Sequence, residues 1–273
     1  MSFELDHAFS SFEDWRLWSS ENDVWRDTRH TTVLASQIVS QGFIEPLTQR
    51  RVTPSDIVPS APGNWREGLI AFGKNSRTRA VLRLIEEKIE ARPPSLVNVY
   101  ATEAVTSFAL CLRGLFPRFL GSEYATSIEG REELYPIPHE DLMHLSLKSG
   151  AFDIVSTNEV LEHIPSIDAA LAEIARVLKP GGWHVGTHPF AFMNESGIVR
   201  TQIVGGQISH LLEPEYHGNP AGPPSLVFET PGWDILNRAR AAGFAFAQMR
   251  FVASERYGYL TENLGVFVLC CQK

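Results

Sequence analysis

Residues 152–182 read FDIVSTNEVLEHIPSIDAALAEIARVLKPGG, and this stretch determines the architecture that we expect. FDIVSTN is an apolar run that ends in polar side chains, which predicts a buried strand. The apolar residues after it recur at spacings of three and four and predict an amphipathic helix: Ile167, Ala170, Leu171, Ile174, Val177 and Leu178. Lys179-Pro180-Gly181-Gly182 is expected to end that helix. A strand followed by such a helix indicates a βαβ unit.

Apolar runs on both sides of this stretch continue the alternation of strands and helices from residue 96 onward. Helices are predicted within SRTRAVLRLIEEKIEARPP (76–94) and PGWDILNRARAAGF (231–244). The candidate strands are LVNVYA (96–101), RFLGSEY (118–124), LMHLSL (142–147), FDIVSTN (152–158), WHVGTH (183–188), FAQMRFV (246–252) and GVFVLCCQ (265–272). We therefore expect an α/β fold with a Rossmann-like, mostly parallel sheet of about seven strands and helices on both faces. The last two strands suit an antiparallel edge.

The N-terminal segment differs in composition from the rest of the chain. Four of the six tryptophans lie there, at Trp15, Trp18, Trp25 and Trp65, together with apolar residues at helical spacing. We expect a helical cap over residues 1–75 and a Rossmann-like domain over 76–273. Within that domain, residues 191–230 form an insertion that is too long for a plain connection, which indicates a substrate loop or lid.

Charge and composition exclude several classes of partner. The net charge is −8 and no basic run is present, so we expect no nucleic-acid binding. The N-terminus MSFELDHAF has no targeting pattern, and no run approaches the roughly 18 apolar residues of a membrane span. We accordingly expect a cytoplasmic protein without membrane contact. Three cysteines, Cys111, Cys270 and Cys271, form neither a disulfide framework nor a metal-ligand spacing.

Residues 152–190, from FDIVSTNEVLEH to GWHVGTHPF, resemble the central part of class I S-adenosylmethionine (SAM) dependent methyltransferases of the type 11 kind. In that family a buried strand ends in a segment rich in Asn and Glu, a helix follows, and Lys-Pro-Gly-Gly leads into the fifth strand. The resemblance implies SAM as the cofactor. The segments NWREGLIAFGKNSRTRA (64–80) and EPEYHGNP (213–220) are similar to segments of a subgroup of such enzymes.

The first loop departs from the family pattern because it contains no glycine. Thr102, Ala104 and Thr106 occupy the positions of the family's three glycines. Tyr100 stands in place of the acidic residue that ends the family's first strand. Glycines let the backbone approach the cofactor closely and adopt positive φ. Two interpretations remain open. Either the site no longer binds SAM, or Glu103 and the hydroxyls of Thr102 and Thr106 supply the missing contacts.

The resemblance assigns cofactor contacts to residues at the ends of several strands. Glu123 is placed at the ribose hydroxyls, Asp141 and Leu142 at the adenine, and Asn158 at the methionine head or the substrate. The full expected cofactor set is Tyr100, Thr102, Glu103, Glu123, Tyr124, Asp141, Leu142, Asn158 and Glu159. The alternatives are a solvated strand-end acid at Glu123 and a turn-forming acid at Asp141. Glu162 and His163 match the family's LEH, or they brace the turn that follows.

Methyl transfer needs mainly an aligned nucleophile, and a histidine can accept its proton. His188, after the fifth strand, and His217, in the insertion, are the candidate catalytic residues; turn hydrogen bonds are the alternative. Glu215 and Tyr216 are candidate substrate contacts. We expect no metal, since Ala71, Phe72 and Gly73 stand where related sequences carry cysteine pairs that resemble a zinc site. The aromatic residues of the cap either form its core or line a substrate or sulfonium pocket.

Three functional hypotheses follow. The first is a SAM-dependent methyltransferase that acts on a hydroxyl or amine of a small-molecule substrate in a biosynthetic pathway. The second is a SAM enzyme that cyclises SAM to azetidine-2-carboxylate or transfers its aminocarboxypropyl group, with release of methylthioadenosine. The third is a non-catalytic scaffold subunit with the same fold. A homodimer formed through the cap is compatible with the sequence, although no specific pattern requires it.

Overall fold

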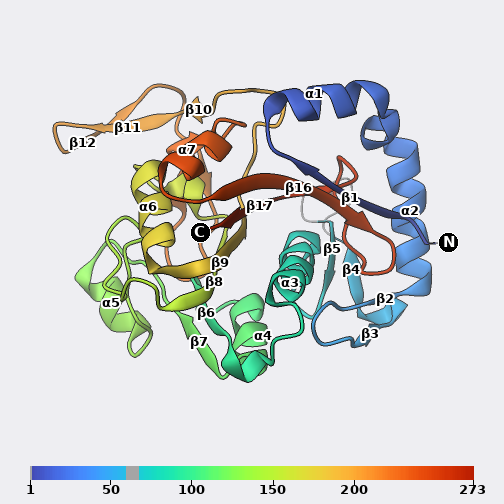
Figure 1. Cartoon of the computed structure of the whole chain (residues 1–273), viewed down its shortest axis with the longest axis horizontal. Helices are drawn as coiled ribbons and strands as arrows, with labels where there is room; N and C mark the ends of the chain where they lie inside the picture. Colours follow the sequence, from blue (N-terminus) through green and yellow to red (C-terminus); the bar gives the residue numbers. More distant parts are fainter. Residues whose placement is uncertain (1, 60–67) are drawn as a thin grey trace. The chain divides into compact units, whose positions relative to one another are not determined.

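The computed structural model describes residues 2–59 and 68–273, and Figure 1 shows its elements in chain order. A seven-stranded sheet has the strand order β1-β16-β17-β9-β8-β6-β7. Its strands are β1 (Glu4–Phe9), β6 (Asn98–Ala101), β7 (Arg118–Gly121), β8 (Phe152–Asn158), β9 (Leu178–Thr187), β16 (Phe246–Ser254) and β17 (Val266–Gln272). β6 is parallel to β7 and to β8, and β8 is parallel to β9. The expected Rossmann-like, mostly parallel sheet is confirmed.

The membership of the sheet differs from the prediction in two places. LMHLSL (142–147) forms no strand, because the Asp141 carboxylate accepts from the Met143 amide at 2.8 Å and the chain turns, leaving a single bridge from Asp141 to His144. Local side-chain hydrogen bonds of this kind compete with strand pairing. The seventh strand is instead β1, which pairs antiparallel with β16. The last two strands are therefore not at the edge.

By compactness the chain divides into two units. The first comprises Met1–Glu90 and Gln248–Leu269, and the second comprises Ala91–Ala247 and Cys270–Lys273. The boundary expected at residue 75 falls inside the first unit, and the division into a cap over 1–75 and a Rossmann-like domain over 76–273 stays a prediction. All the residues expected at the cofactor and substrate sites belong to the second unit.

The first unit contains the helices expected of the cap, and short strands as well. Its further elements are α1 (Phe12–Glu21), η1 (Asp23–Arg26), α2 (Thr28–Gln41), β2 (Phe43–Ile44), β3 (Arg51–Val52), η2 (Pro54–Asp56), β4 (Ile57–Pro59), β5 (Leu69–Ala71) and α3 (Ser76–Ile89). Trp15 and Trp25 are buried, and the Trp15 ring packs edge-on against Phe9 and Phe251. These tryptophans form a core rather than pocket walls. Trp65 lies outside the described residues.

The second unit holds the parallel strands and the helices between them. Its further elements are η3 (Pro94–Leu96), α4 (Ser107–Leu115), α5 (Ile128–Leu134), η4 (Leu161–His163), α6 (Ile167–Val177), β10 (Ile198–Val199), β11 (Thr201–Val204), β12 (Gln207–His210), β13 (Tyr216–His217), β14 (Ser225–Leu226), β15 (Glu229–Thr230) and α7 (Ile235–Ala241). α6 buries its predicted apolar face, and Ser166 caps its N-terminus. β9 begins at Leu178, so Lys179 to Gly182 lie within that strand rather than in a loop.

The insertion at 191–230 folds into two-stranded ribbons. β10 pairs with β15, β11 with β12, and β13 with β14, all antiparallel. The β11–β12 hairpin stands out from the second unit in Figure 1, and several of its apolar side chains are exposed. The insertion is thus ordered backbone that can position side chains, and its role as a substrate loop stays a prediction.

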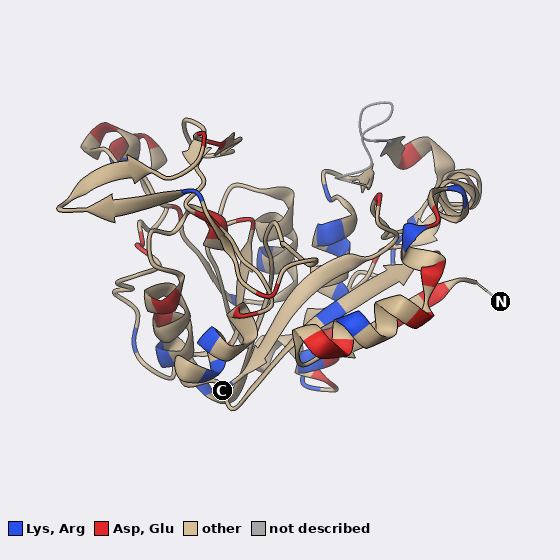
Figure 2. Ribbon diagram, turned by 90° about the horizontal axis from the view of Figure 1, so that it is seen from above, with Lys and Arg blue, Asp and Glu red and all other residues tan. Residues whose placement is uncertain are grey.

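Charge and hydropathy in the structure bear on the expected partners. Figure 2 shows acidic and basic residues interspersed on many of the same elements. No helix among the described residues is long and apolar enough to cross a bilayer. The expectation of no nucleic-acid partner stays a prediction.

Candidate active site at the carboxyl ends of the parallel strands

The glycine-free loop after β6 is held by backbone and side-chain contacts on both sides. The Thr102 amide donates to the Ser156 carbonyl of β8 at 3.2 Å, and the Thr106 hydroxyl caps α4 by accepting from the Ala109 amide at 3.1 Å. None of residues 102–106, all of which the structure describes, has positive φ. The loop therefore follows a path that ordinary L-residues adopt, and glycine is not required there.

Glu103 lies between this loop and the end of β8. Its Oε1 accepts from the side-chain amide (Nδ2) of Asn158 at 2.8 Å, and its Oε2 accepts from the Thr106 hydroxyl. Burial raises the pKa of Glu103 above its ordinary value, the two hydrogen bonds oppose that rise, and the nearby Glu123 charge adds to it. A cation bound beside Glu103 would therefore stabilise the charged carboxylate.

Glu123 fastens the same loop from the other side. Its Oε1 accepts from the backbone amides of Ala104 at 2.7 Å and Val105 at 3.2 Å. Glu123 is the residue that the family pattern places at the ribose, and in this structure one of its oxygens holds the loop. A second oxygen on the same carboxylate is the part of Glu123 that could reach a ribose hydroxyl.

The Thr102 hydroxyl and the Asn158 Oδ1 at this edge are buried without a hydrogen-bond partner among the described residues. An unsatisfied buried polar group costs about 1–3 kcal/mol, so such atoms mark a place where a ligand would be stabilised. Glu159, next to Asn158, adopts φ 53° while its amide donates to the Thr187 carbonyl at 2.8 Å. A non-glycine residue in that conformation is often found at functional sites.

The expected adenine end lies next to Glu123 in the backbone. The Glu140 amide donates to the Glu123 carbonyl at 3.1 Å, which brings Asp141 and Leu142 close to that strand end. Leu142 is buried, whereas Tyr124 is 52% exposed with its ring 5.3 Å from that of His139. The Asp141 carboxylate holds the Met143 amide, which is the turn-forming role weighed as its alternative. Its part in binding adenine stays a prediction.

Tyr100 is the exception among the expected cofactor residues. Its side chain is 0% exposed, and its hydroxyl lies 2.8 Å from the Ser122 hydroxyl inside the sheet. Burial raises the pKa of this phenol, with the Ser122 hydrogen bond opposing the rise. The Tyr100 side chain therefore lies in the core, and its expected contact with the cofactor stays a prediction.

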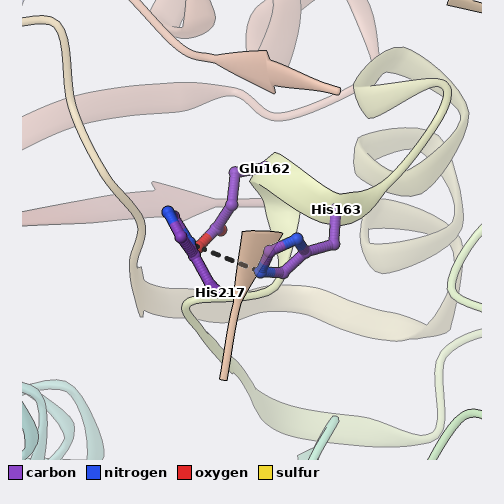
Figure 3. A group of neighbouring side chains, drawn as sticks. All are labelled: Glu162, His163 and His217. Atoms are coloured by element: carbon purple, nitrogen blue, oxygen red, sulfur yellow. Dashed lines mark ion pairs between the residues drawn. The ribbon is translucent and has the colours of Figure 1, made fainter. Parts of the chain in front are cut away.

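Beyond the ends of β8 and β9 lies a second group of polar side chains (Figure 3). Glu162 and His163 come from η4, and His217 comes from β13. Glu162 is 0% exposed, and its Oε1 lies 3.5 Å from His163 Nε2 and 3.5 Å from His217 Nδ1. Figure 3 shows both rings turned toward the carboxylate. The structure thus joins the LEH and YHGNP segments in one cluster.

The expected catalytic and substrate residues lie in or beside this cluster. Burial lowers the pKa of His188 to about 4, while the Glu162 charge opposes that shift. Glu215 lies between His217, at 3.0 Å from its Nε2, and Arg200, at 2.8 Å. Tyr216 is 58% exposed and points away from the neighbouring His217, as alternation along β13 requires. The structure therefore brings His188, His217 and Glu215 to Glu162 and leaves Tyr216 in solvent.

The sequence does not predict that Glu162 and His163 meet His217. The LEH and YHGNP motifs are both visible in it, but their contact depends on the hairpin of β13 and β14 returning to η4. The Phe228 amide donates to the Glu162 carbonyl at 2.7 Å, and His163 Nδ1 lies 2.9 Å from the Leu226 carbonyl. Neither long-range contact can be derived from spacing along the chain.

In this chain, parallel strands of an open α/β sheet end in carboxylate and amide side chains. This arrangement is typical of cofactor- or nucleotide-binding α/β proteins, because their ligands bind at that edge of the sheet. Residues 121–186, which include β8, α6 and nearly all of β9, match the family described as "Methyltransferase domain". This segment is thus similar to methyltransferase domains, and the sheet to which it belongs is Rossmann-like.

The similar proteins described below are methyltransferases by name, and each resembles only part of this chain. A ubiquinone biosynthesis O-methyltransferase from Thiobacillus denitrificans is 50% identical over 34 residues, which are 12% of this chain and 15% of that protein. A SAM-dependent methyltransferase structure from Mesorhizobium loti is 11% identical, with a TM-score of 0.42 over 71% of this chain and 98% of that one. The Burkholderia thailandensis 1,6-didemethyltoxoflavin-N1-methyltransferase, solved with its substrate and S-adenosylhomocysteine, is 14% identical, with a TM-score of 0.41 over 72% and 78%. Similarity at this level carries no argument about activity.

Proposed function

We propose that this protein is a SAM-dependent methyltransferase that methylates a hydroxyl or amine of a small molecule in a biosynthetic pathway. The observation that supports this proposal most directly is the convergence of Glu103, Glu123 and Asn158 at the carboxyl ends of β6, β7 and β8. In chain order, Glu123 and Asn158 lie inside the segment that matches the methyltransferase domain. Glu103 is hydrogen-bonded to Asn158 at 2.8 Å.

The residues at this edge suit the polar groups of SAM. Glu103 offers a buried carboxylate to the methionine ammonium, and the unpartnered Thr102 hydroxyl and Asn158 Oδ1 offer further hydrogen bonds. Glu123 and Asp141 are assigned to the ribose and the adenine amine. When bound, SAM supplies an activated methyl group, so the chain's main task is to align the acceptor and exclude water.

The side chains beyond β9 are assigned to the acceptor. His188, with its pKa lowered to about 4 by burial, stays neutral at physiological pH and is a weak base for a hydroxyl proton. His217, flanked by Glu215 and Glu162, is better placed to orient a polar acceptor. Glu215 is assigned to substrate contact within this cluster, whereas the exposed Tyr216 could contact a substrate only from outside it, and this expectation for Tyr216 stays a prediction.

Product identity tests this proposal against attack on the carbon chain of SAM. The purified protein is incubated with SAM alone and with a panel of phenols, catechols and primary amines, and S-adenosylhomocysteine and methylthioadenosine are quantified by mass spectrometry. We expect S-adenosylhomocysteine that depends on the acceptor and is reduced about 100-fold or more in Glu103→Ala, since charge-assisted contacts to a buried ligand are lost.

Glu129→Gln, a change on the exposed helix α5, is the matched control and should retain full activity. Methylthioadenosine above the protein-free background with SAM alone would overturn methyl transfer. A protein whose unfolding midpoint SAM does not raise would support the scaffold hypothesis instead, because a ligand that binds the native state must raise it.

A further inference from the structure

The Glu162 carboxylate is in an unfavourable environment. It is 0% exposed, and neither of its oxygens has a hydrogen-bond partner anywhere in residues 2–59 and 68–273. A buried carboxylate without hydrogen bonds is costly, and buried charges in proteins are usually paired or coordinate a metal ion. What faces this carboxylate therefore decides its role.

Two imidazole nitrogens face it, and their partners set their protonation. His163 Nδ1 lies 2.9 Å from the Leu226 carbonyl, which can only accept, so Nδ1 carries the proton and Nε2 presents its lone pair. His217 Nε2 lies 3.0 Å from Glu215 Oε1, so in the neutral ring Nε2 carries the proton and Nδ1 presents its lone pair. One atom from each of the three side chains can thus offer an electron pair, and these atoms converge.

The distances among these donors suit a cation at their centre. Both nitrogens lie 3.5 Å from Glu162 Oε1, which is too long for a good hydrogen bond. Ligand atoms about 2.1 Å from a tetrahedral ion stand about 3.4 Å apart. The ligand atoms of Glu162, His163 and His217 all lie within 4.8 Å of one another, so small movements would complete the geometry.

The surrounding backbone holds the three side chains as metal sites require. β13 and β14 pair through His217 with Ser225, so one hairpin carries His217 and supplies the carbonyl that orients His163. Glu215, which orients His217, is itself held by Arg200 at 2.8 Å. Contacts of this kind to the far nitrogen of a histidine fix ring orientation and raise its basicity as a ligand.

From this geometry we propose that Glu162, His163 and His217 form a binding site for a divalent transition-metal ion of the zinc class. Two histidines and one glutamate leave a coordination position open, as in catalytic zinc sites. This proposal departs from the expectation of no metal, which rested on the lack of cysteine pairs at residues 71–73 in the other compact unit. Metal binding here does not depend on methyl transfer. Only the effect of the metal on catalysis rests on the proposed function: a metal-bound His217 would not also accept a proton from the acceptor.

The test uses the full-length protein after treatment with a chelator. Zn²⁺ is added, unbound ion is removed by gel filtration, and the metal is counted by mass spectrometry. We expect about one zinc ion per chain, and a loss of affinity of about tenfold or more in each of Glu162→Gln, His163→Asn and His217→Asn. His210→Asn, a change in the same unit outside the cluster, is the matched control and should bind as the parent does.

Unfolding of the metal-free protein separates this proposal from a structural ion pair. Glu162→Gln removes a buried charge, so its midpoint without metal should equal or exceed that of the parent, and Zn²⁺ should raise the parent's midpoint only. A lower midpoint for Glu162→Gln, together with no effect of Zn²⁺ on the parent, would overturn the metal site. Parent-like zinc affinity in all three variants would do so as well. A zinc-bound protein that transfers no methyl group would refute only the proposed function.

Discussion

Gly121 of β7 packs directly against the carbonyl oxygen of Glu103. A Cβ built on Gly121 would stand 2.6 Å from that oxygen, closer than real Cβ contacts come. The absence of a side chain at Gly121 thus lets the loop after β6 lie close against β7. In this position the Glu103 carboxylate accepts from the Asn158 side-chain amide.

Gly121→Ala should displace this loop and with it Glu103. We expect a loss of about 1–3 kcal/mol in stability, as for overpacking elsewhere, and SAM affinity reduced about tenfold or more because the Glu103 carboxylate moves. Urea unfolding and calorimetric titration with SAM measure the two effects.

Gly114→Ala is the matched control, since its Cβ would meet nothing within 4 Å and the residue lies in helix α4. This change should raise stability by about 0.5–1 kcal/mol and leave SAM affinity unchanged. Equal effects of the two substitutions would contradict the role given to Gly121.

Glu103→Gln separates the folding cost of the buried carboxylate from its binding role. The folded pKa of Glu103 is raised above the ordinary 4.5, chiefly by burial, so between these two values the native state holds more protons than the unfolded state. Stability of the parent should fall as pH rises through that window, and the variant should not show this fall.

Thermal unfolding on either side of pH 4.5 checks the sign of this effect. At neutral pH the variant should be more stable than the parent and yet bind SAM more weakly. Tighter or unchanged SAM binding would remove Glu103 from the proposed cofactor site.

Tyr100→Phe tests whether the buried Tyr100 belongs to the expected cofactor set. Its hydroxyl lies 2.8 Å from the Ser122 hydroxyl, so we expect a loss of about 1 kcal/mol in stability from the unsatisfied partner. SAM affinity, measured by titration, should change less than twofold. A larger loss of affinity in a variant of near-parental stability would return Tyr100 to the cofactor site.

The parallel core could be predicted from sequence because periodicity is local. FDIVSTN coincides with β8, and the apolar face of α6 is buried at the predicted residues. The prediction of a strand at LMHLSL was wrong because the Asp141 side chain competes with strand pairing. The spacing of apolar residues gives no indication of that competition. The sequence does not predict β1, because ELDHAF lacks a strong alternation of apolar and polar residues. Its pairing with β16 is what makes it a strand.

The candidate site divides along the same line. Glu103, Glu123 and Asn158 could be placed because each follows a predicted strand or lies in the loop after one. The meeting of Glu162 with His217 could not, since it depends on how residues 191–230 fold into ribbons. The burial of Tyr100 could not be predicted for a related reason: a residue at a strand's end points either to the core or to the ligand, and the sequence alone does not decide between them.

Lys179, the first residue of the Lys-Pro-Gly-Gly motif, has a structural partner in Asp153 at the start of β8. The Asp153 carboxylate accepts from Lys179 Nζ at 2.7 Å, from the Asn98 amide at 2.8 Å and from Arg92 at 3.0 Å. Burial alone would raise the pKa of Asp153, but these contacts outweigh it and hold the pKa below the ordinary 3.8.

Asp153→Asn should therefore lower stability in a way that depends on pH. Since the folded pKa is depressed, the native contribution is present above 3.8 and is lost as pH falls toward the folded value. We expect the variant to be about 1–3 kcal/mol less stable at neutral pH, because Lys179 and the Asn98 amide lose a charged acceptor. Urea unfolding at decreasing pH should bring the two proteins together in acid. A gap that persists unchanged at the lowest pH would show that packing at β8, rather than the charge of Asp153, is what the motif secures.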